Sequence, residues 1–151
     1  MAFANDTLVL TPNGDKKIST IKVDDKVKAR LDDESWETKT VDFSAGTQAK
    51  TSAVTIVYGN QQEIIVTPNQ LFLVSEELFK AAKDLEITDT LMDQSGAAVT
   101  ILQISEGKYT GGIHSIALSE HPTANTDGHL ILCNGVVAGA YELEMAYRVD
   151  L

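Results

Sequence analysis

Cysteine, proline and long apolar runs are scarce in this chain of 151 residues, which has one Cys and three Pro. The single cysteine, Cys133, excludes an internal disulfide and a zinc site made of several cysteines. No apolar run approaches the ~20 residues needed to cross a membrane. The first residues, MAFANDT, also lack the charged and apolar stretches of a signal peptide. We therefore expect no disulfide and no membrane partner.

Basic residues are also few: 12 Lys and Arg stand against 22 Asp and Glu, so the net charge is −10. Nucleic acids and anionic membranes bind basic patches, so this balance argues against both as partners. The three histidines, His114, His121 and His129, lack the close spacing of zinc ligands. The acidic stretch 24–34 lacks the alternating oxygen ligands and the central glycine of a calcium loop. We expect no metal, no other cofactor and a monomeric protein.

Apolar residues make up 43% of the chain and are spread over many short runs. This length and composition predict one globular domain covering residues 1–151. The runs are rich in β-branched residues and are separated by turn residues, which predicts an all-β fold. Two-residue hairpin turns are expected at Gly59-Asn60 and Asn134-Gly135. Strands are expected at 7–10, 17–23, 38–44, 53–58, 64–66, 71–74, 87–92, 98–104, 113–118, 129–132 and 136–141.

One helix is expected, over residues 75–85. Ser75 can cap its N-terminus, and Glu76 and Glu77 suit its first turn. Four apolar residues then share one side of the expected helix: Leu78, Phe79, Ala82 and Leu85.

Residues 63–74, EIIVTPNQLFLV, form the stretch around which the rest of the chain is organised. Two apolar runs flank the polar kink 67–70 (TPNQ). Pro68 cannot donate to a sheet ladder and restricts the residue before it, so the kink has to leave the sheet. This places the hydroxyl of Thr67 and the amide of Gln70 at one bend. The alternative is an ordinary polar turn between two strands.

Two segments, 21–27 (IKVDDKV) and 85–91 (LEITDTL), share one pattern: apolar, any residue, apolar, any residue, Asp, any residue, apolar. A repeat at such a long period suggests two similar β-subdomains. The alternative is coincidence in a β-rich sequence.

Four motifs, one of which occurs twice, extend over nearly the whole chain and resemble those of the Hint domain, the module shared by hedgehog autoprocessing domains and inteins. Residues 2–7 (AFANDT) resemble the opening Cys-Phe-x-x-(Gly/Asp)-Thr, and 66–71 (VTPNQL) resembles the Thr-x-x-His box. The two repeated segments resemble the Leu-x-x-Gly-Asp-x-Val elements, and 129–141 (HLILCNGVVAGAY) resembles the closing hairpin. The resemblance implies a horseshoe of two β-subdomains related by a pseudo-twofold axis.

The resemblance also implies a chemistry. In the family, a Cys at the first position attacks the preceding carbonyl, so that an amide becomes a thioester. The hydroxyl of the Thr-x-x-His box fixes the scissile amide, and its imidazole protonates the leaving nitrogen. A second nucleophile resolves the thioester in hedgehog domains, whereas a terminal Asn cyclises in inteins. The matching catalytic positions here are Ala2, Thr67 and Gln70.

This sequence departs from the family at decisive positions. Ala2 has no nucleophile, so this chain cannot form the thioester. Met1 followed by Ala2 is typical of a start codon and a substitution made to stop self-cleavage; the alternative is a naturally degenerate member. Gln70 stands where His is usual, and an amide cannot shuttle a proton near neutral pH. His121 is then the candidate for a substitute acid. Cys133 is expected to be a buried thiol; the alternative is a second nucleophile.

The closing hairpin also departs from the intein pattern. The intein His-Asn pair falls on Gly139 and Ala140, which excludes Asn cyclisation, although Asn134 is present in the turn. The chain continues through 141–151, and the hedgehog pattern Ala-Ser-Cys-Tyr falls on 138–141 (AGAY). We therefore expect a domain closer to the hedgehog type than to splicing inteins. Segment 41–46 (VDFSAG) offers no clear counterpart of the aspartate used with a sterol acceptor, so no sterol acceptor is expected.

The sequence as a whole predicts a self-cleaving Hint domain. Its parent would perform an N-to-S acyl shift at the peptide bond preceding residue 2. Its partners would be its own N-terminal flanking polypeptide as the substrate, and water, a thiol or another small nucleophile as the acceptor. The alternative, favoured by Gln70, is a catalytically inert Hint-like domain that serves as a structural or protein-binding module.

Overall fold

The computed structural model describes residues 2–75 and 78–149, which form antiparallel strands and, within these ranges, one α-helix. The strands are β1 (Phe3–Ala4), β2 (Leu8–Thr11), β3 (Gly14–Lys17), β4 (Lys26–Arg30), β5 (Trp36–Thr40), β6 (Phe43–Thr47), β7 (Thr51–Tyr58), β8 (Gln62–Val66), β9 (Leu71–Ser75), β10 (Leu78–Ala81), β11 (Thr90–Met92), β12 (Ala98–Tyr109), β13 (Ile113–Ala117), β14 (Leu130–Cys133) and β15 (Val136–Gly139). The helices are the 3₁₀ turns η1 (Ile18–Thr20) and η2 (Ala82–Asp84) and the α-helix α1 (Tyr141–Val149).

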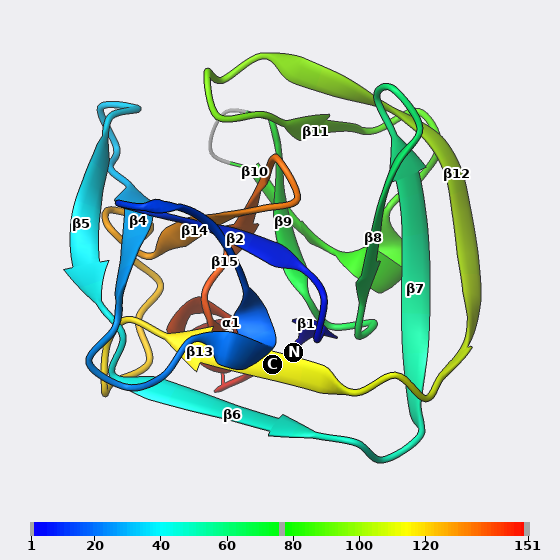
Figure 1. Cartoon of the computed structure of the whole chain (residues 1–151). Helices are drawn as coiled ribbons and strands as arrows, with labels where there is room; N and C mark the ends of the chain where they lie inside the picture. The colour runs from blue at the N-terminus through cyan, green and yellow to red at the C-terminus, as the bar shows by residue number, and fades with distance from the viewer. Residues whose placement is uncertain (1, 76–77, 150–151) are drawn as a thin grey trace.

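Two antiparallel sheets make up the fold, as expected for a Hint-type horseshoe. One has the order β11-β12-β7-β8-β1-β13-β6, and the other has the order β10-β9-β15-β14-β2-β3, with β4 joining β14 to β5. In Figure 1, β7 and β12 run along one side of the molecule, and β4 and β5 run along the other. The core between them contains fully buried Ile, Val, Leu and Phe side chains from both sheets. The short strand β1 lies inside the first sheet, between β8 and β13.

The internal repeat is visible as two matching corners. Each corner has a 3₁₀ turn, η1 or η2, followed by an aspartate that accepts the backbone N–H three residues earlier. Asp25 accepts from Lys22 at 2.8 Å, and Asp89 accepts from Glu86 at 2.8 Å. A lysine pairs with each aspartate from the preceding strand: Lys16 with Asp25, and Lys80 with Asp89. The shared pattern therefore reflects a repeated β-unit rather than coincidence.

The two corner aspartates predict a specific acid sensitivity. The backbone amide of Lys22 lowers the pKa of Asp25, and the backbone amide of Glu86 lowers that of Asp89. A lowered pKa in the folded state stabilises the fold above the unfolded-state pKa, ~3.9, and this contribution is lost as the pH falls through the folded-state pKa. We expect the double variant Asp25→Asn/Asp89→Asn to melt a few degrees below the parent at pH 7. Thermal unfolding should show this gap closing as the pH falls through the folded-state pKa values of the two aspartates, and a gap that persists at still lower pH would contradict the assignment.

The helix expected over 75–85 is wrong. Leu78–Ala81 form β10, which pairs with β9, and only the 3₁₀ turn η2 follows. Pairing with β9 overrides a modest helical preference because tertiary contacts decide between such short options. The expected acidic first turn, Glu76 and Glu77, lies outside the described residues.

Three smaller expectations are also corrected. Segment 17–23 is not one strand, because η1 turns the chain there and buries Ile18 and Ile21. Segment 38–44 is divided between β5 and β6, which lie in different sheets. The 59–60 turn is a three-residue loop, since Tyr58 pairs with Gln62 and both Gly59 and Gln61 have positive φ.

The closing hairpin turn is confirmed. Cys133 pairs with Val136, and Asn134 (φ 47°) and Gly135 (φ 82°) form the two-residue turn between them. Positive φ at both central residues matches the twist of the flanking strands. Cys133 is fully buried, as expected, and this burial raises the pKa of its thiol.

Candidate functional site: the start of the chain and the proline kink

Ala2 is held inside the fold by the kink residue Thr67. The Ala2 amide donates a hydrogen bond to Thr67 Oγ1 at 2.8 Å, and the Thr67 amide donates to the Ala2 carbonyl at 2.9 Å. The Thr67 hydroxyl also lies 3.4 Å from the Ala2 carbonyl oxygen. Ala2 is 4% exposed and Thr67 is 8% exposed. One hydroxyl therefore contacts both backbone polar groups of residue 2 in a water-poor environment.

Strand pairing fixes this position. Phe3 pairs with Val66 of β8 on one side and with His114 of β13 on the other. Continuing both antiparallel registers by one residue sets Ala2 beside Thr67 and opposite Ser115. Successive side chains of a strand point to opposite faces, so the side chains of Ala2 and Ser115 share a face. No pattern in the sequence marks Ser115, because only this strand register places it opposite Ala2.

The kink itself is a closed turn. The backbone N–H of Gln70 donates to the Thr67 carbonyl at 3.1 Å. Two backbone N–H groups of the following corner complete the turn: Lys83 donates to the Pro68 carbonyl, and Ala82 donates to the Gln70 carbonyl. Because Pro68 has no N–H, the chain cannot continue the β8 ladder and turns here. Figure 1 shows β8 and β9 as separate strands on either side of this turn.

Gln70 binds the closing hairpin. Its side-chain Nε2 donates to the carbonyls of Gly139 (2.9 Å) and Leu71 (3.1 Å), and the residue is 1% exposed. Two carbonyl acceptors fix the orientation of the amide, since only its NH₂ can donate. Among the hydrogen bonds of residues 2–75 and 78–149, none joins the Gln70 side chain to Ala2. The turn 67–70 therefore links residue 2 to the end of β15.

The closing hairpin carries its own cross-links. Asn134 Oδ1 accepts from the Leu8 amide at 2.8 Å, and Asn134 Nδ2 donates to the Glu63 carbonyl at 2.9 Å. These bonds tie the hairpin turn to β2 and β8. Gly139 and Ala140 have no polar side chain, so only their backbone groups can form hydrogen bonds. The Ala140 amide donates to the His129 carbonyl at 3.1 Å.

A histidine–carboxylate pair, made of the half-buried His129 and the buried Glu142, lies at the same end of the hairpin. His129 Nδ1 is 2.7 Å from Glu142 Oε2, and Glu142 Oε1 accepts from the Leu118 amide at 3.0 Å. Glu142 is 1% exposed, on the first turn of α1. Its burial raises the pKa of the carboxyl group, and its hydrogen bond with His129 opposes that rise. Sequence reasoning missed this pair because a helix was not expected after the hairpin.

His121 lies apart from these contacts. It is exposed, in the loop after β13, and its backbone exchanges hydrogen bonds with Ser119. It lines a hollow of about 390 Å³ beside α1, where Phe43 and Tyr141 stack with ring centroids 5.5 Å apart. Within the described part of the chain, no hydrogen bond joins His121 to Ala2, Thr67 or Gln70. Its role as a substitute acid stays a prediction.

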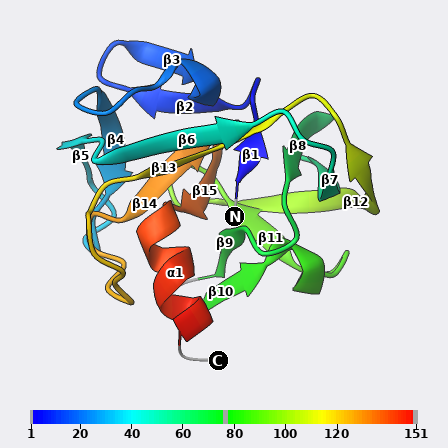
Figure 2. The ribbon, with the colours of Figure 1, turned by 90° about the horizontal axis from the view of Figure 1, so that it is seen from below.

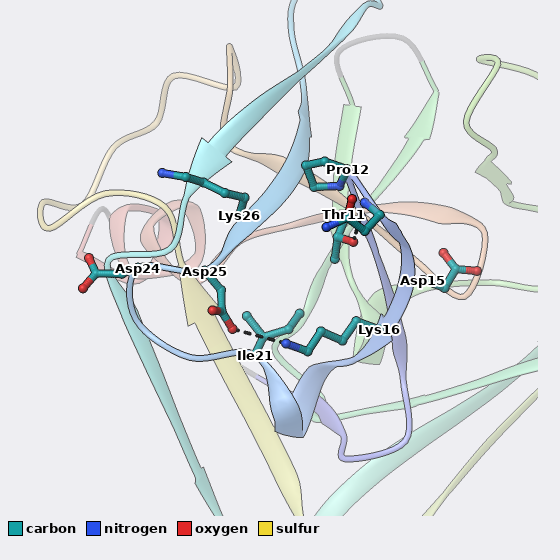
Figure 3. A pocket seen from close by; sticks show the side chains of 9 residues that line it. Thr11, Pro12, Asp15, Lys16, Ile21, Asp24, Asp25 and Lys26 are labelled. Atoms are coloured by element: carbon teal, nitrogen blue, oxygen red, sulfur yellow. Dashed lines mark hydrogen bonds and ion pairs between the residues drawn. The ribbon is translucent and has the colours of Figure 1, made fainter.

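A second hollow, of about 420 Å³, lies at the β2–β3 turn and holds several charged residues. Figure 3 shows the Lys16–Asp25 ion pair across it, with Asp15 and Asp24 on opposite sides. Asp25 also accepts the Lys22 amide, so this carboxylate belongs to the first corner of the repeat. Across residues 2–75 and 78–149, no group of three His, Cys, Asp or Glu could hold a metal ion. No helix within those ranges is long and apolar enough to cross a membrane.

The two sheets, the pseudo-twofold corners and the buried start of the chain define a Hint-type domain, the fold of inteins and intein-like domains. A bacterial intein-like domain from Clostridium thermocellum is similar over 91% of this chain and 97% of its own, with a TM-score of 0.78 and 22% identity. A DnaB intein from Synechocystis sp. PCC 6803 is similar over 92% and 97%, with a TM-score of 0.73 and 17% identity. The gp41-1 intein is similar over 91% and 97%, with a TM-score of 0.71 and 23% identity.

No protein-family model matches the sequence, and no curated protein matches it. The similarity is therefore one of fold, at identities between 17% and 23%. These neighbours are all inteins or intein-like domains, and they leave the expected closeness to the hedgehog type as a prediction.

Proposed function

We propose that this chain is the self-processing module of a protein that cleaves the peptide bond preceding residue 2. The parent activity needs a cysteine at position 2, where this chain has Ala2. The observation that supports the proposal is the contact between Ala2 and Thr67: one hydroxyl reaches both the N–H and the carbonyl of residue 2. A buried hydroxyl at this distance can hold the nitrogen of the scissile bond in a fixed orientation.

The proposed reaction is an isomerisation followed by transfer. The cysteine sulfur bonds to the carbonyl carbon of the preceding residue, and the bond from that carbon to the nitrogen of residue 2 breaks. The thiol proton ends on that nitrogen, so the products of the first step are a thioester and a free amine. Water, a thiol or another small nucleophile then takes the acyl group from sulfur. Gly139 and Ala140 cannot cyclise, so release by a terminal Asn is not part of the proposal.

A catalytically inert module is the second candidate, and Gln70 favours it. Its side-chain amide is bound to the carbonyls of Leu71 and Gly139, so it acts as a tie between the kink and β15. A Hint-type domain that has lost both the nucleophile and the box imidazole would keep its fold through such ties. It would then serve as a structural or protein-binding domain.

One fusion experiment separates the two candidates. A reporter protein is joined upstream of this domain, with Ala2→Cys in the test protein and the parent alanine in the control. We expect the test protein to release the reporter, faster with an added thiol, and mass spectrometry to find a thiol adduct at the reporter C-terminus. The alanine fusion should stay intact. A cysteine fusion that remains whole with and without thiol would favour the inert module.

A further inference from the structure

The hollow of about 390 Å³ beside α1 takes no part in the proposed chemistry. It lies between the edge strand β6, the loop that follows β13 and the first turns of α1. Figure 2 shows α1 beside that loop, and the Thr123 amide joins the two by donating to the Glu142 carbonyl at 3.2 Å. Small-molecule sites have volumes of about 300–1,000 Å³, so this hollow is large enough to hold a small ligand.

The walls of the hollow are largely apolar and include two aromatic rings. Phe43 lies opposite Ala117 in the β6–β13 pair, so their side chains share one face of the sheet. Tyr141, the first residue of α1, stacks on Phe43 with ring centroids 5.5 Å apart and an angle of 19° between the rings. Phe43 still remains 41% exposed, and Pro122 and Met145 extend the apolar lining. The stacked pair therefore offers aromatic surface to a ligand.

The charge around the hollow is acidic. Asp42 and Glu120 are exposed and line it, and among the described side chains no Lys or Arg forms an ion pair with either carboxylate. None of the described residues that line the hollow is Lys or Arg, and His121 is the one histidine among them. The whole chain also has a net charge of −10. These carboxylates therefore attract a cation to the hollow.

The buried part of the hollow favours a cation that has no N–H groups. The third lining carboxylate, Glu142, is buried, and each of its oxygens already has a partner: His129 Nδ1 at 2.7 Å and the Leu118 amide at 3.0 Å. An N–H group that lost its water against the apolar walls would need an acceptor there. A quaternary ammonium group has no N–H to satisfy, and its positive charge is attracted by the faces of aromatic rings.

We propose that this hollow binds a small organic cation, a quaternary ammonium ion, between the Phe43–Tyr141 pair and the carboxylates of Asp42 and Glu120. The volume, near the lower end of the range for ligand sites, suits a free small molecule. The inference goes beyond the proposed function and does not depend on it, because none of the described lining residues belongs to the turn 67–70.

Choline and 3,3-dimethyl-1-butanol test the need for positive charge, since the two molecules have nearly the same shape and only choline is charged. Each is titrated into the alanine chain at low salt and about pH 8, above the usual titration range of histidine. The NMR signals of the Tyr141 ring and the Met145 methyl group report binding. We expect choline to shift both signals to saturation and the neutral alcohol to bind about 10-fold more weakly. Added salt should weaken the binding of choline.

Two variants test the residues that the inference names. Asp42→Asn/Glu120→Gln removes both charges with little change of shape, and we expect it to lower the affinity for choline about 3- to 10-fold. Phe43→Leu keeps an apolar side chain without a ring and should lower the affinity about 5-fold. Glu106→Gln, an exposed carboxylate of β12 that does not line the hollow, is the matched control and should change nothing.

Thermal unfolding confirms that each variant is folded before its affinity is compared. The inference is overturned if choline causes no saturable shift of the two signals. It is equally overturned if the neutral alcohol binds as tightly as choline, which would make the hollow a site for uncharged apolar molecules. An unchanged affinity in Asp42→Asn/Glu120→Gln would contradict the role of the two carboxylates. All of these measurements use the alanine chain, so their outcome is independent of whether the cysteine fusion cleaves.

Discussion

Replacing Thr67 by valine in the Ala2→Cys fusion should slow release of the reporter by about 10²-fold, the order of loss expected when a group that positions the reacting atoms is removed. Valine has nearly the shape of threonine but cannot accept the N–H of residue 2, a bond of 2.8 Å here. The backbone bond from the Thr67 amide to the Ala2 carbonyl does not depend on the side chain and should remain. The measurement is the single-turnover rate of cleavage with and without thiol.

Thr67→Ser is the matched control, since it keeps the hydroxyl and loses only a methyl group. We expect this variant to retain most of the rate. Thermal unfolding of the same variants shows how much valine destabilises the fold. Losing one hydrogen bond lowers the free energy of unfolding by about 1–3 kcal/mol when the partner group stays buried. Equal cleavage rates for threonine and valine would remove Thr67 from the proposed mechanism.

The architecture was largely predictable, because turn chemistry and strand periodicity are local properties. Asn134-Gly135 marked the closing hairpin, and Pro68 marked the point where β8 leaves its sheet. The long-period pattern marked the two corners, whose aspartates accept equivalent backbone amides. In each case a few neighbouring residues determine the conformation, so a single sequence was enough.

The errors arose where distant contacts decide the local structure. Leu78–Ala81 joined β9 instead of starting a helix, and segment 38–44 broke at Val41, whose amide and carbonyl bond to Asp25 and Asp24. The helix that does form, α1, follows the closing hairpin, and Glu142 on its first turn binds His129, the residue before β14. Such pairings bring together residues far apart in the chain, and no local pattern specifies them.

The candidate site also has one part that the sequence predicted and one part that depends on contacts between distant segments. The proximity of Ala2 and Thr67 was expected from the resemblance and is found in the structure. The side-chain amide of Gln70 points toward Gly139 rather than toward residue 2, and this direction depends on the pairing of β15 with β9. The His129–Glu142 pair depends on the same end of the molecule. The sequence therefore identified which residue types belong to the candidate site, whereas the hydrogen-bond partners of those residues are determined by the folded structure.

Gln70→His should have opposite effects on stability and on cleavage. A neutral imidazole has one N–H, so it can donate to only one of the two carbonyls that the Gln70 amide now satisfies. Leaving the other carbonyl without this donor should lower the free energy of unfolding by about 1–3 kcal/mol. In the Ala2→Cys fusion, the new imidazole adds a general acid at the box position, and we expect cleavage to accelerate by about 10²-fold, near the lower limit for such a group.

Gln70→Leu separates these two effects, because it removes both hydrogen bonds and supplies no proton donor. It should lower the stability at least as much as the histidine variant and should not accelerate cleavage. Denaturant unfolding of the alanine chain measures the first quantity, and single-turnover release of the reporter measures the second. A histidine variant that cleaves no faster than the glutamine parent would mean that the tie to Gly139 matters more than an added acid. Gln70 would then be a required part of the site rather than a lost catalyst.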